Sequence, residues 1–179
     1  SEAPLSRRSF IRQSTAAAAG TALLPAVLPH VHASVDDEIK IALIGCGGRG
    51  TGACVQALST AGPVKLWAMA DAFPDQLEKS YKSLVAGTRK FSQSPDAGSQ
   101  AAKVNVPPER RFVGLDAYKQ VMALSEVDVV LMTTPPGFRP VQFAAAVKAG
   151  KHVFMEKPVA TDPHGIRTVL EAAKLAKRK

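Results

Sequence analysis

The chain of 179 residues has little of what marks several large protein classes. It holds two cysteines and 6% aromatic residues, and it has no long, uniformly apolar run. Two cysteines make neither a disulfide framework nor a metal site, because no second Cys/His pair stands at ligand spacing. Without about 20 consecutive, strongly apolar residues, a stable membrane-spanning helix is excluded. At 46% hydrophobic residues, the chain is expected to form one globular domain of ordinary size.

The net charge of +8 is concentrated at the two ends of the chain. Residues 1–33 contribute +2 and the last six residues contribute +4, so only +2 remains for residues 34–173. The body has no stripe of Lys or Arg interleaved with aromatic residues, which argues against nucleic-acid binding. Basic ends of this kind are typical of a solvated tail or an export signal.

The first 33 residues are arranged like an export signal. The run Ser6-Arg7-Arg8-Ser9-Phe10-Ile11-Arg12 precedes an uncharged stretch rich in Ala and Leu, and Val31-His32-Ala33 offers a cleavage site. Paired arginines before a large apolar residue resemble the twin-arginine signal. We expect the twin-arginine export machinery to deliver the protein to the periplasm, with cleavage near Ala33. A cytoplasmic enzyme whose Arg-Arg start is incidental is the alternative.

After a linker over residues 34–38, short apolar runs alternate with helical segments. Strands are expected over residues 40–44, 64–70, 111–113, 127–132 and 152–155, and helices over 51–61, 74–84, 115–124, 140–149 and from Asp162-Pro163 onward. The polar stretch 86–109, with three prolines, is expected to be a long loop. The alternation predicts an α/β fold with a doubly wound parallel sheet, the Rossmann fold, over residues 39–162. Residues 163–179 are expected to form a helix that leads to a further domain.

A glycine-rich loop follows the first expected strand. Gly45-x-Gly47-x-x-Gly50 stands between strand and helix, and Asp71 comes 21 residues after Gly50, at the end of the second strand. Gly45 would make the tight turn, Gly47 would let the backbone approach a pyrophosphate, and Gly50 would allow close helix–strand packing. The N–H groups at the helix start, that of Gly48 included, would bind the phosphates. The loop therefore predicts a dinucleotide site.

Asp71 and Arg49 bear on which dinucleotide binds and how. Asp71 is expected to accept hydrogen bonds from the adenosine ribose. The residues after it, Ala72-Phe73-Pro74, supply no Arg or Ser for a 2′-phosphate, which favours NAD over NADP. Arg49 is a second candidate for the phosphates, with a solvent-facing side chain in the first helical turn as the alternative.

The run Gly150-Lys151-His152-Val153-Phe154-Met155-Glu156-Lys157-Pro158 carries a family resemblance. With Ile44-Gly45-x-Gly47 and Thr134-Pro135-Pro136, it resembles the glucose–fructose oxidoreductase / inositol dehydrogenase / rhizopine catabolism (Gfo/Idh/MocA) family over residues 38–178. The resemblance implies an NAD(P)-dependent oxidoreductase that transfers hydride between a nicotinamide and a sugar, cyclitol or derivative. It also implies a second domain, missing from this chain, which binds substrate, supplies an acid/base Asp or His and forms homo-oligomers.

The resemblance assigns roles at the ends of the last two strands. The matching Lys157 would be catalytic, beside the nicotinamide and the reacting hydroxyl. Glu156 would contact the nicotinamide-side ribose, and Thr134 with Pro135 would shape the cofactor wall. An ammonium at the carboxyl end of a parallel strand suits this role, because it can hold a hydroxyl and stabilise charge as the proton leaves. Many relatives have a histidine after Thr-Pro; Arg139, in that stretch here, either contacts cofactor or substrate or starts the helix.

Two other functions fit the same residues. One is an NAD-dependent glycosidase of the same superfamily, which oxidises its sugar transiently, and the other is a non-catalytic dinucleotide-binding module. If free NAD is scarce outside the cytoplasm, an exported enzyme would have to bind its cofactor tightly and recycle it within one catalytic cycle.

Overall fold

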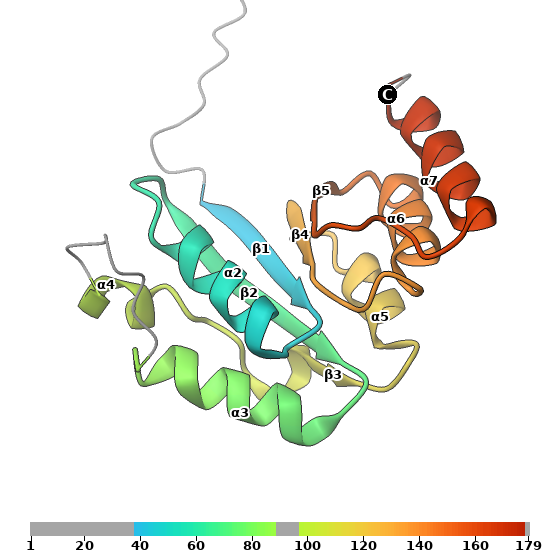
Figure 1. Ribbon diagram of the computed structural model, residues 1–179. Helices are drawn as coiled ribbons and strands as arrows, with labels where there is room; N and C mark the ends of the chain where they lie inside the picture. The colour runs from blue at the N-terminus through green and yellow to red at the C-terminus, as the bar shows by residue number, and fades with distance from the viewer. Residues whose placement is uncertain (1–37, 89–96, 178–179) are drawn as a thin grey trace, which may run out of the picture. The chain divides into compact units, whose positions relative to one another are not determined.

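The computed structural model describes residues 38–88 and 97–177 (Figure 1). The predicted twin-arginine signal and all of the linker but Glu38 lie outside the described residues. Export and periplasmic localisation therefore stay predictions. Among the helices that are described, none is both long and apolar enough to cross a membrane.

Five parallel strands form one sheet in the order β3-β2-β1-β4-β5 (Figure 1). The strands are β1 (Ile39–Ile44), β2 (Val64–Asp71), β3 (Arg111–Val113), β4 (Val129–Met132) and β5 (His152–Met155). This is the strand order of the Rossmann fold, whose winding reverses between β1 and β4. The predicted doubly wound parallel sheet is confirmed. Ligands of such sheets bind at the reversal, outside the carboxyl ends of the strands.

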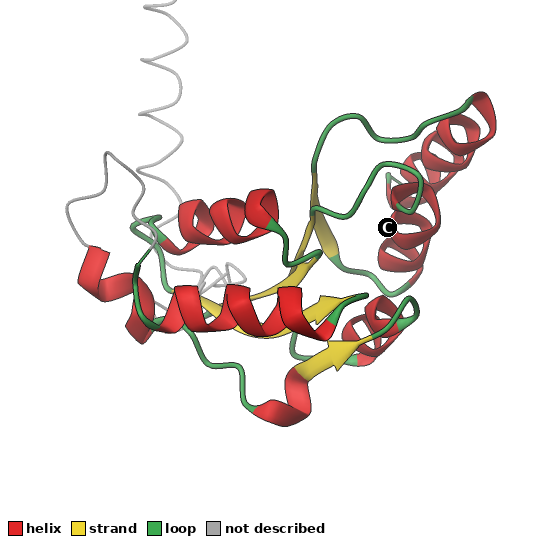
Figure 2. Ribbon diagram, turned by 60° about the horizontal axis from the view of Figure 1, so that its bottom comes forward, coloured by secondary structure: helices red, strands yellow, loops and turns green. Residues whose placement is uncertain are grey.

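Helices cover both faces of the sheet (Figure 2). They are α2 (Gly48–Leu58), α3 (Pro74–Val85), α4 (Ala97–Ala102), α5 (Ala117–Ala123), α6 (Arg139–Lys148) and α7 (Pro163–Ala176), with the 3-10 turn η1 (Pro108–Arg110) before β3. Helices α2 and α3 share a core with one face of the sheet, and α5 and α6 share a core with the other. Helix α7 packs against α6, and the side chain of Asp162, the residue before it, caps its start by accepting the Gly165 N–H at 2.9 Å.

The central strand β1 shows why the core has two layers. Successive side chains of a strand point to opposite faces of the sheet. Ile41 and Leu43 pack with α2 and α3, whereas Ala42 and Ile44 pack with α5 and α6. All four residues are buried, as expected for a strand covered on both faces. An irregularity after Ile41 adds Trp67 to β2, and the alternation resumes beyond it.

Helix α2 differs most from the expected boundaries. It begins at Gly48 rather than Thr51, because the glycine loop itself supplies the first helical turn, with Thr51 N donating to Gly47 O at 2.9 Å. It ends at Leu58 rather than at residue 61. The other expected helices and strands agree with the structure within about two residues at each end, which is the usual uncertainty of such boundaries.

The expectation of one long loop over residues 86–109 is wrong for part of that stretch. It contains α4, and Val104 then pairs with Leu66 in an isolated parallel bridge. Val106 is buried in the core beneath α2 and α3. Val104 and Val106 are two residues apart, which is the spacing of side chains on one face of a strand. The prolines and polar residues around them obscured this pattern in the sequence. The two valines fasten this connection to the outer side of β2.

Lys151, from the run that carries the family resemblance, is placed as a structural residue. Its Nζ donates hydrogen bonds to the carbonyls of Leu124 (2.6 Å), Val127 (2.8 Å) and Ser125 (3.4 Å), and so holds the connection between α5 and β4.

Replacing Lys151 with methionine is expected to lower the free energy of unfolding by about 1.5–3 kcal/mol, because the carbonyls lose a charged donor. Urea denaturation would measure the loss. Lys79→Met, which changes an exposed side chain of α3, serves as the control and should stay within about 0.5 kcal/mol of the wild type. Equal midpoints for the two variants would contradict the structural role.

Candidate functional site

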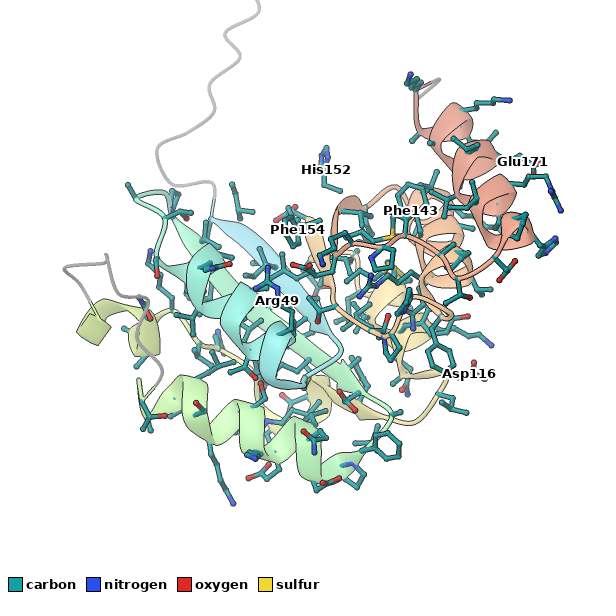
Figure 3. All side chains as sticks on the ribbon, in the orientation of Figure 1. Arg49, Asp116, Phe143, His152, Phe154 and Glu171 are labelled. Atoms are coloured by element: carbon teal, nitrogen blue, oxygen red, sulfur yellow. The ribbon has the colours of Figure 1, made fainter. Side chains whose placement is uncertain are left out.

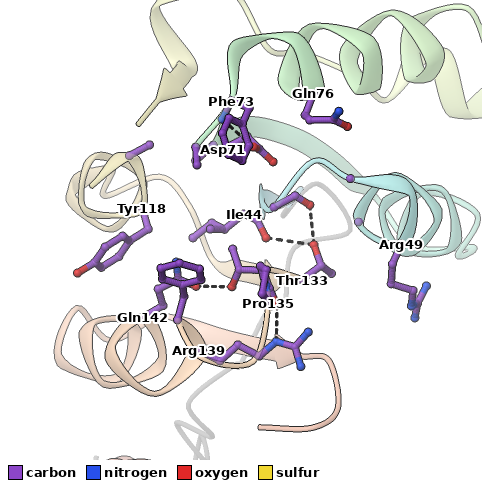
Figure 4. Close-up of a pocket in the computed structure, with 18 of the residues that line it drawn as sticks. Ile44, Arg49, Asp71, Phe73, Gln76, Tyr118, Thr133, Pro135, Arg139 and Gln142 are labelled. Carbon is purple, nitrogen blue, oxygen red and sulfur yellow. Dashed lines mark hydrogen bonds between the residues drawn. The ribbon is translucent and has the colours of Figure 1, made fainter. Parts of the chain in front are cut away.

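A cavity of about 730 Å³ lies at the carboxyl ends of the strands (Figure 4). Its volume falls within the range of about 300–1,000 Å³ that is usual for small-molecule and cofactor sites. The residues predicted to bind the cofactor all line it: Gly45, Gly47, Gly48, Arg49, Gly50, Asp71, Thr134, Pro135, Glu156 and Lys157. The topology thus brings the glycine loop, the end of β2, the Thr-Pro segment and the Glu-Lys-Pro segment to one place.

The glycine loop is held close to β4, yet it leaves open space on its cavity side. Gly45 has a φ of +94°, and a Cβ on it would lie 2.7 Å from the backbone nitrogen of Thr134. A Cβ on Gly50 would lie 1.9 Å from the carbonyl oxygen of Gly45. A Cβ on Gly47, in contrast, would meet nothing within 4 Å. That open space beside the start of α2 fits the pyrophosphate of a dinucleotide.

Asp71 is fixed by two backbone donors. Its Oδ2 accepts the Cys46 N–H at 2.5 Å, and its Oδ1 accepts the Phe73 N–H at 2.9 Å. The carboxylate therefore ties the glycine loop to the end of β2. Because each oxygen of a carboxylate can accept more than one hydrogen bond, Asp71 still has acceptor sites for hydroxyl groups that enter the cavity.

Thr133, which sequence reasoning missed, locks the glycine loop onto β4. Its Oγ1 donates to Gly45 O at 2.7 Å and to Ile44 O at 3.1 Å (Figure 4). Next to it, the Thr134 hydroxyl donates to Oε1 of Gln142 at 2.6 Å. Its position in the sequence could have identified Thr133 as a site residue. It is the first residue after β4, and the carboxyl ends of parallel strands meet at one edge of the sheet.

Apolar side chains on the Asp71 side of the cavity were also missed. Phe73 and Leu115 line it and are 63% and 72% exposed. Tyr118, on α5, completes this wall (Figure 4). An exposed aromatic ring and an aliphatic side chain beside Asp71 offer the apolar surface that an adenine ring requires.

Arg49 and Glu156 form an ion pair between two sides of the cavity. The guanidinium Nη2, from the first turn of α2, contacts Oε1 of Glu156, which follows β5. The Arg49 side chain is 50% exposed and that of Glu156 is 12% exposed. Arg49 therefore does not simply face solvent, and both partners line the cavity, where a bound ligand would reach them.

Lys157 and Arg139 contrast in burial and bonding. Lys157 is exposed at the cavity, and within residues 38–88 and 97–177 nothing forms a hydrogen bond or ion pair with its Nζ. Arg139, the first residue of α6, is 5% exposed, and its guanidinium donates hydrogen bonds to backbone carbonyls. Burial lowers the pKa of Arg139, and the Glu156 carboxylate opposes that shift. A guanidinium nonetheless stays protonated in proteins.

No metal site accompanies this cavity in the described part of the chain. Among the residues that the structure describes, no three His, Cys, Asp or Glu side chains are grouped to hold a metal ion. His152 is exposed on β5 and does not line the cavity (Figure 3).

The two cysteines are buried free thiols. Burial raises the pKa of Cys54 to about 12. Burial, and after it the charge of Asp71, raise the pKa of Cys46. At neutral pH both thiols are therefore less ionised than an exposed cysteine, which makes them poor nucleophiles.

We expect neither thiol to react with Ellman's reagent at pH 8 in the folded protein, and both to react in urea. The pKa of each thiol is higher in the folded state than in the unfolded chain. The free energy of unfolding is therefore unaffected by these thiols below pH 9.0, and it decreases above pH 9.0, where only the unfolded chain loses these protons. A thiol count on folded and unfolded protein, and urea midpoints between pH 8 and 10, would check both points. One thiol titrating rapidly in the folded protein would contradict the burial.

The chain is similar in sequence to known proteins. The family model described as "Oxidoreductase family, NAD-binding Rossmann fold" matches residues 39–179. A glycosyl hydrolase family 109 protein from Shewanella amazonensis is 26% identical over 164 residues, which are 92% of this chain and 31% of that protein. The chain thus spans 31% of the length of the curated relatives it matches first.

Two solved structures share the fold. A dehydrogenase from Bordetella pertussis, in complex with NADH and UDP-GlcNAcA, is 24% identical with a TM-score of 0.55, and the match covers 79% of this chain and 34% of that one. A 3-ketoreductase from Actinomadura kijaniata, in complex with TDP-benzene and NADP, is 20% identical with a TM-score of 0.52, and the match covers 77% and 35%. Both likenesses concern the architecture of the sheet and its helices.

Proposed function

The chain belongs to the Gfo/Idh/MocA oxidoreductase family, and from its site we propose that it is the cofactor-binding part of an NAD-dependent oxidoreductase. The substrate class is a sugar, a cyclitol or a derivative of these. One observation carries the proposal: the glycine-rich loop, Asp71 and Lys157 line the same cavity. A nucleotide can therefore extend from the loop toward Lys157.

The cofactor proposed is NAD rather than NADP. The glycine loop and the start of α2 would hold the pyrophosphate, and Asp71 would accept the adenosine ribose hydroxyls. Its carboxylate is held in place by two N–H donors and would repel a 2′-phosphate. Bound there, the cofactor supplies the hydride acceptor or donor. The family as a whole binds NAD(P), so this preference is a specific proposal for this chain.

Lys157 is the catalytic residue of the proposal. Its ammonium would hold the reacting hydroxyl or carbonyl of the substrate and stabilise the negative charge that develops on that oxygen. Glu156 would bind the ribose on the nicotinamide side, and Thr134 with Pro135 would form the wall beside it. The proton acceptor and the contacts of a homo-oligomer would come from parts of such an enzyme other than the dinucleotide-binding domain.

We further propose that the enzyme works in the periplasm with a retained cofactor. Residues 1–33 support export through their paired arginines and small-x-small cleavage site. An exported enzyme would regenerate its cofactor within each cycle, either by oxidising one sugar and reducing another or by oxidising one sugar transiently.

An NAD-dependent glycosidase is the second candidate function. The relative named as a glycosyl hydrolase family 109 protein favours it. In such an enzyme the same Lys157 would assist a transient oxidation, and the reaction would consume no net NAD. Release of sugar from an aryl glycoside without net NADH formation would distinguish this candidate from a dehydrogenase.

The first experiment is to purify the full-length protein from its native compartment, denature it and identify the released nucleotide by mass spectrometry. Stoichiometric NAD would support an enzyme with a retained cofactor. NADP in its place would overturn the cofactor preference. A protein that is empty and also fails to bind added dinucleotide would overturn the enzyme proposal and favour a module without catalysis.

A further inference from the structure

We propose that Arg139 is a positioning residue: its buried guanidinium fixes the backbone on both sides of Lys157 and so sets where the Lys157 ammonium stands in the cavity. The inference rests on the proposed function, because it takes Lys157 as the catalytic residue. It also replaces the two roles considered from the sequence, a ligand contact or a plain helix start.

The hydrogen bonds of Arg139 bracket Lys157. Its Nη1 donates to the carbonyl oxygens of Glu156 at 2.7 Å and Pro158 at 2.5 Å, the residues directly before and after Lys157. Its Nε donates to Thr134 O at 2.6 Å (Figure 4). One planar group therefore joins the segment after β4, which is predicted to shape the cofactor wall, to the segment after β5, which is predicted to meet the nicotinamide half.

In the described part of the chain, the position of the Lys157 side chain is fixed only through its backbone. No described residue forms a hydrogen bond or ion pair with its Nζ, so its location follows from its backbone. That backbone is tied to β4 at Glu156, whose N–H donates to Met132 O at 3.0 Å. Beyond that point, the Arg139 guanidinium holds the carbonyls on either side of Lys157.

Helix α6 provides the rigid base for this arrangement. Arg139 is its first residue, and Gln142 lies three residues later in the same turn. Gln142 accepts the Thr134 hydroxyl at 2.6 Å, while Arg139 binds the Thr134 carbonyl. Both side chains are nearly buried, at 5% and 6% exposure. The segment after β4 is thereby held at two atoms, and the guanidinium extends that rigid support to Lys157.

The geometry requires an arginine. Two nitrogens of one plane, Nε and Nη1, make bonds in different directions, which a single ammonium cannot reproduce. A lysine here would keep the charge and reach some of the carbonyls, so it should restore the function only in part. A methionine would fill the space and leave all three carbonyls without their donor.

Lys151 offers a matched control for a merely structural effect. It too is a cation that donates to three backbone carbonyls, but it does so between α5 and β4 and does not line the cavity. If Arg139 acted only on stability, Arg139→Met and Lys151→Met would have the same consequences.

The test measures how far bound NAD shields Lys157 from chemical modification in the full-length protein. Acetic anhydride modifies exposed lysines, and mass spectrometry gives the acetylation rate of Lys157 with and without saturating NAD. We expect NAD to protect Lys157 fully in the wild type and in Lys151→Met, and partly in Arg139→Lys. In Arg139→Met most of this protection should be lost.

Turnover of Arg139→Met should fall roughly 10- to 100-fold, the size of effect that a displacement of about 1 Å can have. Affinity for ADP, which lacks both the nicotinamide and the ribose assigned to Glu156, should stay near that of the wild type.

The outcomes separate the two proposals. Failure of NAD to protect Lys157 in the wild type would overturn the proposed function itself. Equal protection in the wild type and Arg139→Met would overturn the positioning role. If Arg139→Met does not fold, Arg139→Lys decides: reduced protection with normal ADP affinity supports the role, and full protection contradicts it.

Discussion

Replacing Lys157 with methionine is expected to lower turnover roughly 10²- to 10⁴-fold, the usual contribution of a group that assists proton transfer. Dinucleotide affinity should fall much less than turnover, because the other residues predicted to bind the cofactor remain. The Lys157 side chain is exposed in the cavity and makes no hydrogen bond with any described residue, so its removal takes away the charge near the reacting oxygen and no structural contact. Steady-state kinetics on the full-length enzyme and NADH fluorescence titration would measure the two quantities.

Lys174→Met is the matched control for that variant. It removes an exposed lysine from α7, which does not line the cavity, and should leave turnover unchanged. Wild-type turnover in Lys157→Met would contradict the catalytic role. A large loss of dinucleotide affinity with unchanged turnover would reassign Lys157 to cofactor binding.

Replacing Asp71 with alanine is expected to weaken NAD binding about 10- to 100-fold, equivalent to losing hydrogen bonds to a charged group worth roughly 1.4–2.8 kcal/mol. The variant also leaves the N–H groups of Cys46 and Phe73 without their acceptor, which loosens the glycine loop. NADP binding should suffer less, because the charge that repels a 2′-phosphate is gone. Calorimetric titration of both nucleotides gives the preference for NAD over NADP, which should fall.

Asp75→Ala is a suitable control, since it removes an exposed carboxylate from the first turn of α3, four residues further on. Neither affinity should change in that variant. An unchanged preference in Asp71→Ala would show that another group selects the cofactor, and tighter binding of NADP than NAD by the wild type would contradict the assignment directly.

The fold could be predicted from the sequence because burial patterns and glycine spacing are local signals. The run from Ile41 to Ile44 is apolar on both faces, which only a strand covered on both sides requires. Gly45 and Gly50 stand where the turn and the helix approach the neighbouring backbone too closely for any side chain. Each of these structural requirements is met by one residue or a short run of residues, so it can be recognised in the sequence alone.

The missed features depend on contacts between distant segments. Thr133 is a common residue type, and its role comes from reaching Gly45 and Ile44 across the sheet. Arg139 looks like an ordinary residue at a helix start until the fold brings Glu156 and Pro158 against it. Helix α4 is short and weakly apolar, and what fastens its neighbourhood is the pairing of Val104 with Leu66. No local pattern encodes such pairings.

The central position of β1 in the sheet also affects how the chain folds while the ribosome synthesises it. One side of β1 pairs with β2 soon after it emerges, but the other side waits for β4, whose Val129 pairs with Ile41 about 90 residues later. At roughly 5–20 residues per second, this edge stays open for about 4–18 seconds of translation. An apolar strand with an unpaired edge is prone to pair with other chains. The nascent chain should therefore depend most on chaperones between the emergence of β1 and the emergence of β4. Slowing translation within that interval should increase aggregation more than slowing it after β4 has emerged.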